Sequence, residues 1–289
     1  IGSDKMFYVK VCATSANVCV GFDVLGLALN LENTFSFEKA DDFCFVGFEK
    51  PFDQKENNLV YHAYEAVFRK VNKNLIPVKI GFQGQIPIAR GLGSSSSLIV
   101  AGMLAANHIL KNPLGKNELL QIGAKLEGHP DNIAPALFGG LVASYYHEGY
   151  HSINYPVSQD LKFITISPNY EVSTAKARAI LPKMVSYADA TANLSYIIHI
   201  PKAFESGDLK LMNDLFCDKL HEPYRKKLIK EYDMVYQICR SLGAVLAISG
   251  SGSTMLVITK NANDIEKFKI KDCQVRLLEI GKEARIEEV

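Results

Sequence analysis

Hydrophobic and polar residues alternate along several short stretches in the first half of the chain. Phe7, Val9 and Val11 alternate with Tyr8 and Lys10, and a period of two is typical of a strand that is buried on one face. Similar patterns predict further strands at 34–38, 43–46, 78–82 and 141–146. The strand at 43–46 is expected to return from a turn at 41–42.

Apolar residues spaced three and four positions apart predict helices between these strands. Val60, Tyr64, Val67 and Val71 indicate a helix over 57–71. Two more helices are expected, one apolar and ending near Leu110, the other over 116–127. In the second half, helical patterns dominate 173–242, and the predicted strands are 163–166, 244–248, 254–258 and 275–280.

Strands and helices intermix in both halves, which predicts an α+β fold of two domains. The boundary is placed between an N-terminal domain at 6–157 and a C-terminal domain at 158–289. Residues 1–5 precede a methionine, Met6, and are interpreted as a cloning remnant rather than as part of the fold.

Composition and charge exclude several classes of protein. The chain has 289 residues, and its 32 Lys and Arg against 31 Asp and Glu give a net charge of +1. This balance is not that of a protein that binds duplex DNA or an anionic membrane. The apolar runs are shorter than the roughly 18 residues of a membrane-spanning helix, and no signal peptide is recognised. The six cysteines form no CxxC pair, which fits a cytoplasmic protein without a zinc site.

The strongest chemical signal is the loop from Pro87 to Ser97, which lies between a predicted strand and an apolar helix. Gly91 and Gly93 allow a sharp turn and a close approach to a ligand. The free N–H groups and the positive dipole end of the following helix attract an anion, and phosphate is the obvious one. A capped helix after a glycine turn is the simpler interpretation. The loop matches neither the Walker A pattern nor the dinucleotide fingerprint.

Two further segments place polar side chains within apolar runs. Asn17 and Asp23 follow the first predicted strand, where they form either a turn or one wall of a cleft in which Asp23 holds an ammonium group. Glu127, His129, Asp131 and Asn132 fall within six residues between predicted helices. They form either a capping network or a site, and Glu127 suits Mg²⁺, which takes a carboxylate together with substrate phosphates.

A Gly- and Ser-rich turn at 248–254 lies between two apolar strands and permits a close approach to the first glycine loop. Arg178 and Arg225 are single arginines in their segments. A lone arginine is usually a surface side chain, but a guanidinium is also the natural clamp for a carboxylate.

Taken together, these segments resemble the small-molecule kinases of the GHMP superfamily. Within it, the run from Asn17 to Leu29 and the run from Glu127 to Ala136 are similar to those of the homoserine kinase family. The resemblance covers the chain from about residue 8 to its end. It departs from the family pattern at Cys12, at Cys19–Val20 and at two serines of the last loop, Ser251 and Ser253.

The resemblance implies a two-domain GHMP kinase fold, with an N-terminal domain like the second domain of ribosomal protein S5 and a ferredoxin-like C-terminal domain. It also implies that ATP phosphorylates the hydroxyl of L-homoserine to give O-phospho-L-homoserine for threonine synthesis. Mg²⁺ is the expected cofactor, and a homodimer is an assembly that the resemblance allows.

The resemblance also implies roles for particular residues. Asn17, Asp23, Glu127 and Asn132 are the expected catalytic residues, and the serine at the start of the helix, Ser95 or its neighbour Ser94, would hold Mg²⁺ with Glu127. The expected substrate-binding residues are Asn17, Asp23, His129, Asn132, Thr174, Arg178 and Arg225. The expected nucleotide-binding residues are Pro87, Ile88, Ala89, Arg90, Gly91, Leu92, Gly93, Ser94, Ser95, Ser96 and Ser97.

Phosphoryl transfer needs mainly positioning and charge stabilisation, so no dedicated general base is expected. Three alternatives stay open at this point. Another kinase of the superfamily, of the mevalonate or shikimate type, would share the loops. A non-catalytic relative would bind ligand without turnover. A nucleic-acid-binding module is suggested by the ribosomal likeness of one domain, but the balanced charge argues against it.

Overall fold

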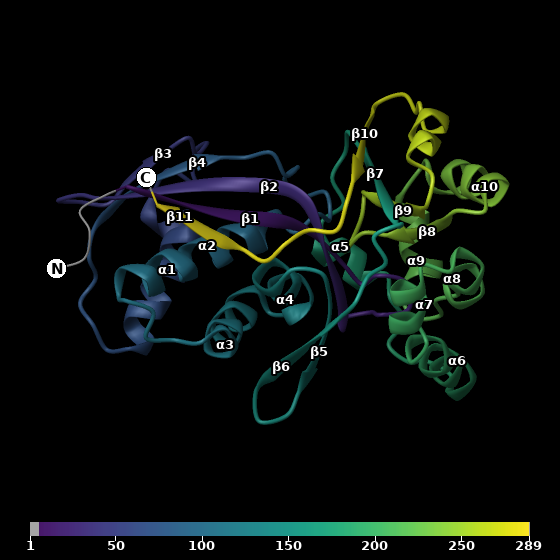
Figure 1. Ribbon diagram of the computed structural model, residues 1–289, viewed down its shortest axis with the longest axis horizontal. Coiled ribbons are helices and arrows are strands. Elements are labelled where there is room, and N and C mark those ends of the chain that lie inside the picture. Colours follow the sequence, from purple (N-terminus) through teal and green to yellow (C-terminus); the bar gives the residue numbers. More distant parts are fainter. Residues whose placement is uncertain (1–5, 289) are drawn as a thin grey trace.

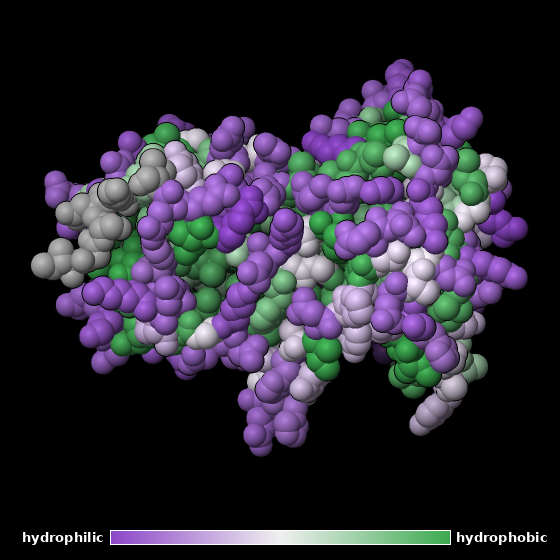
Figure 2. Space-filling model, in the orientation of Figure 1, coloured by the Kyte–Doolittle hydropathy of each residue, from purple (hydrophilic) through white to green (hydrophobic). Residues whose placement is uncertain are grey.

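The computed structural model describes residues 6–288, so the interpretation of residues 1–5 lies outside the described part of the chain. Two lobes lie side by side, each with its own β-sheet (Figure 1). The strands and helices mix within each lobe, and the predicted α+β class is confirmed. Polar side chains cover most of the face shown in Figure 2, and apolar side chains occupy smaller, separate areas.

The first lobe is a mixed sheet with helices packed on one face. The strands run in the order β11-β1-β2-β4-β3, and β5 joins β2 and carries β6. Their bounds are β1 (Phe7–Ala16), β2 (Leu25–Lys39), β3 (Cys44–Val46), β4 (Val78–Gln83), β5 (Leu141–Tyr146), β6 (Tyr150–Tyr155) and β11 (Arg285–Glu288). The helices are α1 (Leu59–Lys70), α2 (Ser94–Ile109), α3 (Lys116–Glu127) and α4 (Pro130–Phe138).

The alternation that predicts the first strands also defines their buried face. Val9, Val11, Phe35 and Phe37 are fully buried against the four helices in a single apolar cluster. Helix α1 begins two residues after the predicted start at 57, because Asn58 caps it by accepting the N–H of Tyr61 at 3.0 Å.

The second lobe is a four-stranded antiparallel sheet in the order β10-β7-β9-β8. Its strands are β7 (Lys162–Pro168), β8 (Val245–Ile248), β9 (Met255–Thr259) and β10 (Cys273–Leu278). The helices are α5 (Thr174–Ala179), α6 (Tyr187–Ile197), α7 (Ile200–Ser206), α8 (Leu209–Leu215), α9 (Glu222–Arg225) and α10 (Tyr232–Leu242). Short 3-10 helices lie before α1 at 55–57 and in the second half of the chain at 226–228 and 262–267.

Three strands of the first sheet differ from the sequence prediction. One of them, β6, was not predicted and pairs with β5. The predicted strand at 43–46 does return from its turn, but it pairs in parallel with β4, which separates it from β2. Strand β11 was not predicted and pairs with β1 in the first sheet, although it follows the second lobe in the chain. Pairing between segments so distant in sequence leaves no local pattern from which to predict it.

The two lobes share an apolar core. Leu25, Leu27 and Leu29 of β2 lie in one buried cluster with Phe163 of β7 and Phe204 of α7. The predicted division between residues 157 and 158 stays a prediction. The shared core fixes the lobes against each other, and loops of both lobes meet along this junction to form the site described next.

Candidate active site

A cleft of about 790 Å³ gathers the loops that the sequence analysis singled out. Most of the predicted site residues line it: Asn17, Asp23, Ile88, Ala89, Arg90, Gly91, Gly93, Ser94, Ser95, Glu127, His129, Asn132, Thr174, Arg178 and Arg225. Pro87, Leu92, Ser96 and Ser97 do not line it. The fold therefore brings together segments that lie more than 200 residues apart.

The loop before α2 is held tightly between the two lobes. Gly93 has a left-handed conformation (φ 67°), and a Cβ there would lie 1.9 Å from Oγ1 of Thr14. Gly91 also has a positive φ, and a Cβ there would lie 2.2 Å from the carbonyl oxygen of Ser249. Only glycine tolerates both demands. Gly93, Ser94 and Ser95 line the cleft at the start of α2, and free N–H groups at a helix N-terminus favour an anion.

The four serines at the start of α2 divide into two groups. Ser95 and Ser96 donate hydrogen bonds to the same carboxylate oxygen of Glu127, at 2.7 and 3.0 Å. Ser97 is fully buried, donates to the carbonyl of Ser94 at 2.7 Å and accepts from Nδ2 of Asn33 at 2.9 Å. Ser97 therefore anchors the helix, whereas Ser95 and Glu127 present hard oxygen atoms beside the helix N-terminus.

The turn after β1 is arranged by the side chain of Asn17. Its Oδ1 accepts the N–H of Asp23 at 2.8 Å, and its Nδ2 donates to the carbonyl of Gly250 at 3.1 Å. Asn17 is 5% exposed and, like Asp23, has a positive φ. These bonds fix the Asp23 carboxylate at the cleft and attach the turn to the Gly- and Ser-rich turn of the second lobe.

Arg178 of α5 is paired directly with Asp23. Its two Nη atoms donate to the two carboxylate oxygens of Asp23 at 3.0 and 2.9 Å, and Nη2 lies 2.9 Å from Nε2 of His129. The hydrogen bonds to Asp23 raise the pKa of the Arg178 guanidinium. The structure thus brings together residues from three distant segments: Asp23 and Arg178 form a forked ion pair, and His129 contacts the same guanidinium.

Arg225 of α9 differs from Arg178 in burial and in partners. It is 1% exposed, its Nε donates to the carbonyl of Ala177 at 3.3 Å, and its Nη1 donates to the carbonyl of Gly250 at 3.0 Å. Within residues 6–288 no carboxylate lies in ion-pair contact with it. Burial and the nearby positive charge of Arg178 lower its pKa. A buried cation without a counter-ion is costly, so this guanidinium suits an anionic ligand.

Asp131 lines the same cleft, although the sequence analysis assigned it no role. It is 5% exposed in the first turn of α4, and burial, reinforced by the negative charges of Asp23 and Glu127, raises its pKa to about 7. A buried carboxyl with a pKa near neutrality is a feature of active sites. The position of Asp131 between His129 and Asn132, close to Glu127 in the sequence, was the signal from which it could have been predicted as a site residue.

The far end of the cleft is apolar and was also missed. Phe48 and Phe82 stack there with ring centres 5.1 Å apart and an interplanar angle of 22°. Phe52, Leu59 and Ile86 line the same end. These residues come from the loop after β3, from β4 and the loop that follows it, and from the start of α1. No motif marks them, because an apolar pocket can be built from many side chains.

Comparisons with known proteins agree with this architecture and cleft. The model for the GHMP kinases N terminal domain matches residues 58–140, and the model for the GHMP kinases C terminal domain matches residues 202–269. The fold and the site therefore define the chain as a GHMP kinase, as the sequence resemblance predicted.

The relatives narrow the class. A homoserine kinase of Clostridium botulinum (strain Alaska E43) is 40% identical over 287 residues, with 95% of each chain covered. One of Clostridium beijerinckii is 39% identical and covers 95% of this chain and 93% of its own. The chain belongs to the homoserine kinase family. The crystal structure of homoserine kinase from Cytophaga hutchinsonii superimposes with a TM-score of 0.88 at 26% identity, covering 99% of this chain and 98% of that one. The phosphomevalonate kinase of Streptococcus pneumoniae, at 14% identity and a TM-score of 0.74 over 99% and 100% of the two chains, shares the fold.

Proposed function

We propose that this protein transfers the γ-phosphoryl group of ATP to the hydroxyl of L-homoserine, giving O-phospho-L-homoserine for threonine synthesis. The family to which the chain belongs supports this activity. The observation that supports homoserine binding in the cleft is the environment of Arg225. This buried guanidinium has no carboxylate partner among the described residues and lies close to the ion pair of Arg178 and Asp23. An α-amino acid carries the carboxylate and the ammonium group that these side chains can bind.

The nucleotide is proposed to span the cleft from its apolar end to the start of α2. The base would lie against the stacked rings of Phe48 and Phe82, since aromatic faces stack on a flat heterocycle. The phosphates would meet the N–H groups of α2 and the loop around Gly91 and Gly93.

The donor set beside α2 fits a magnesium ion that is shared with the phosphates. Glu127 accepts two serine hydroxyls and so places a carboxylate and Ser95 together at the helix N-terminus. No group of three or more His, Cys, Asp or Glu able to hold a metal occurs among residues 6–288, so phosphate oxygens would complete the coordination, as is usual for Mg²⁺. When bound, the ion would neutralise the charge that develops on the transferred group.

The acceptor is proposed to bind by exchanging partners with the Asp23–Arg178 ion pair. The substrate ammonium would form an ion pair with Asp23, and the substrate carboxylate would bind Arg178 and Arg225. Each buried or half-buried charge would then have a partner. His129 and Thr174 line the same cleft. The two arginines and Asp23 line one cleft, and Arg178 is already paired with Asp23 before the substrate enters.

Asn132 is proposed to orient the reacting hydroxyl. Its Oδ1 accepts the hydroxyl of Thr14 at 2.7 Å, and its Nδ2 would donate to the substrate oxygen. With the acceptor held at its charged end and the phosphates held by α2, positioning and charge stabilisation supply the catalysis. The hydroxyl proton would leave to a phosphate oxygen or to solvent.

An ADP-release assay over a panel of hydroxyl acceptors tests this proposal. L-homoserine is expected to give the highest kcat/KM, well above mevalonate, shikimate and L-serine. Mass spectrometry of the product should show one phosphoryl group on homoserine. Equal rates with all acceptors, or ADP release that does not depend on homoserine, would contradict the assignment, and ligand binding without turnover would favour a non-catalytic relative.

A further inference from the structure

Phe22 lies at the tip of the turn between Asn17 and Asp23 and contacts both arginines of the cleft. Its ring centre is 5.5 Å from Cζ of Arg178 and 5.1 Å from Cζ of Arg225. These arginines come from α5 and α9. One aromatic ring therefore contacts two cations from two separate helices, at distances typical of cation–π interactions.

The ring of Phe22 is supported by His221. The two rings stack with centres 5.3 Å apart and an interplanar angle of 22°. His221 is fully buried, and burial lowers its pKa, so the imidazole is neutral. Its Nε2 lies 3.2 Å from the carbonyl of Cys19, an acceptor, so Nε2 carries the proton. This bond ties His221 to the turn that bears Phe22.

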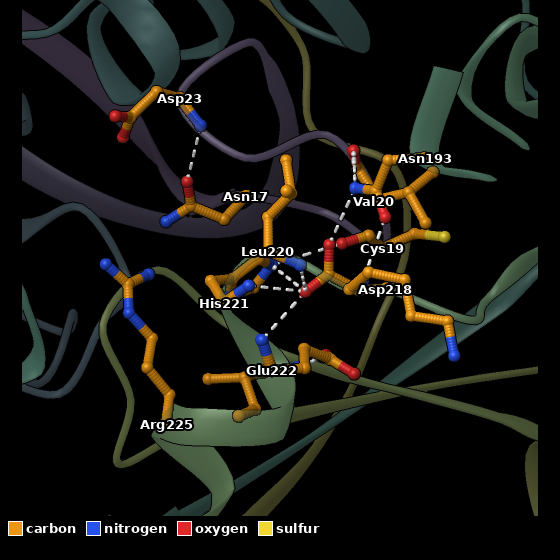
Figure 3. Close-up of polar contacts among 12 residues, drawn as sticks. Asn17, Cys19, Val20, Asp23, Asn193, Asp218, Leu220, His221, Glu222 and Arg225 are labelled. Atoms are coloured by element: carbon orange, nitrogen blue, oxygen red, sulfur yellow. Dashed lines mark hydrogen bonds and ion pairs between the residues drawn. The ribbon is translucent and has the colours of Figure 1, made fainter. Parts of the chain in front are cut away.

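The segment that carries His221 is fixed by a buried carboxylate, Asp218. Its Oδ2 accepts the N–H groups of Leu220, His221 and Glu222 at 3.1, 2.6 and 2.8 Å. Its Oδ1 accepts Nδ2 of Asn193 from α6 at 2.9 Å. Figure 3 shows Asp218 at the centre of these bonds, on the segment that leads into α9 and Arg225. Phe22 thus rests on a rigid support that also carries one of the two arginines.

The two arginines need such a support because their charges oppose each other. The positive charge of Arg178 lowers the pKa of Arg225, and of the two arginines only Arg178 has a carboxylate partner within residues 6–288. During acceptor binding Arg178 would release Asp23, and the two guanidiniums would then be held together by the substrate carboxylate alone. The negative face of an aromatic ring attracts both cations without supplying a competing anion.

We propose that Phe22 is a positioning residue that holds Arg178 and Arg225 at the spacing required for the substrate carboxylate, with His221 as its support. This inference rests on the proposed function, because it assigns Phe22 to selection of the carboxylate-bearing acceptor. Phe22 acts through the two arginines and takes no part in phosphoryl transfer itself.

The test compares Phe22→Leu, which removes the aromatic face, with Phe22→Tyr, which retains it. Each is assayed with homoserine and with 3-aminopropanol, which lacks the carboxylate. Phe22→Leu is expected to raise the KM for homoserine about tenfold, because the two cation–π contacts that hold the arginines are lost. The KM for ATP and the rate with 3-aminopropanol should change less than about twofold. Phe22→Tyr should stay within about threefold of the wild type.

The matched control is Tyr145→Leu, because Tyr145 also stacks on a histidine, His151, with ring centres 5.1 Å apart, but lies on the exposed β5–β6 hairpin outside the cleft. It should leave both acceptors unaffected. If Phe22→Leu does not fold, as judged by thermal denaturation, Phe22→Met replaces it. An unchanged KM for homoserine, equal losses with both acceptors, or equal losses in the Leu and Tyr variants would overturn the role of Phe22. A wild type inactive on homoserine would instead refute the proposed function.

Discussion

Replacing Asp131 by asparagine should stabilise the free protein, and more so as the pH rises. Burial and the charges of Asp23 and Glu127 raise the pKa of this carboxyl from 3.8 to about 7. The folded state therefore binds a proton that the unfolded state has lost between these two values, and stability falls as pH rises through that window. At about 1.4 kcal/mol per pKa unit, the full cost above pH ~7 is about 4 kcal/mol.

Asparagine keeps the shape of the side chain and cannot ionise. Asp131→Asn is thus expected to raise the free energy of unfolding by about 4 kcal/mol near pH ~8 and by less than about 2 kcal/mol near pH ~5. The pKa of about 7 already includes the opposing effect of Arg178, whose positive charge lowers the pKa of Asp131. Urea denaturation of the wild type and of Asp131→Asn, without ligands and at both pH values, measures this difference in the free energy of unfolding.

Asp160→Asn is the matched control, because Asp160 is exposed and its replacement should have the same small effect at both pH values. The pH dependence is the decisive readout, since a loss or gain of packing would change stability equally at both values. A variant whose stability relative to the wild type is the same near pH ~5 and pH ~8, or that loses stability as pH rises, would refute the reasoning about this carboxyl.

Three further outcomes are expected. Gly93→Val, whose Cβ would lie 1.9 Å from Oγ1 of Thr14, should abolish ATP binding in calorimetry with the fold retained; unchanged affinity would remove the loop from the site. Glu127→Gln should lower kcat by roughly a hundredfold (~3 kcal/mol) and raise the Mg²⁺ requirement, and near-normal activity at low Mg²⁺ would make Glu127 structural. Arg178→Leu and Arg225→Leu should each cost about 2–5 kcal/mol in kcat/KM for homoserine with little change in the KM for ATP, and equal losses with 3-aminopropanol would exclude carboxylate recognition.

Much of this protein follows from local patterns in its sequence. The alternation at Val9 and Val11 predicts a half-buried strand because side chains on a strand point to opposite faces, and β1 buries both residues. The glycines and serines between Gly91 and Ser97 predict the start of a helix, and α2 begins at Ser94. The predicted serine cap is wrong, because the N-cap is Gly93 and no side chain caps the helix. The α+β class and the membership of the GHMP kinases are confirmed. The roles assigned to individual site residues remain predictions.

Contacts between distant segments were decided only by the tertiary structure. Asp23 and Arg178 stand 155 positions apart, and their pairing depends on how the two lobes share one core. Phe22 becomes a partner of two arginines, and Asp131 acquires a raised pKa, because burial and neighbouring charges are properties of the assembled cleft. Periodicity and turn chemistry act over a few residues, so the sequence by itself determined most of the strands and helices and the glycine-rich loop before α2, whereas the ionisation and partners of the buried charges arose from packing.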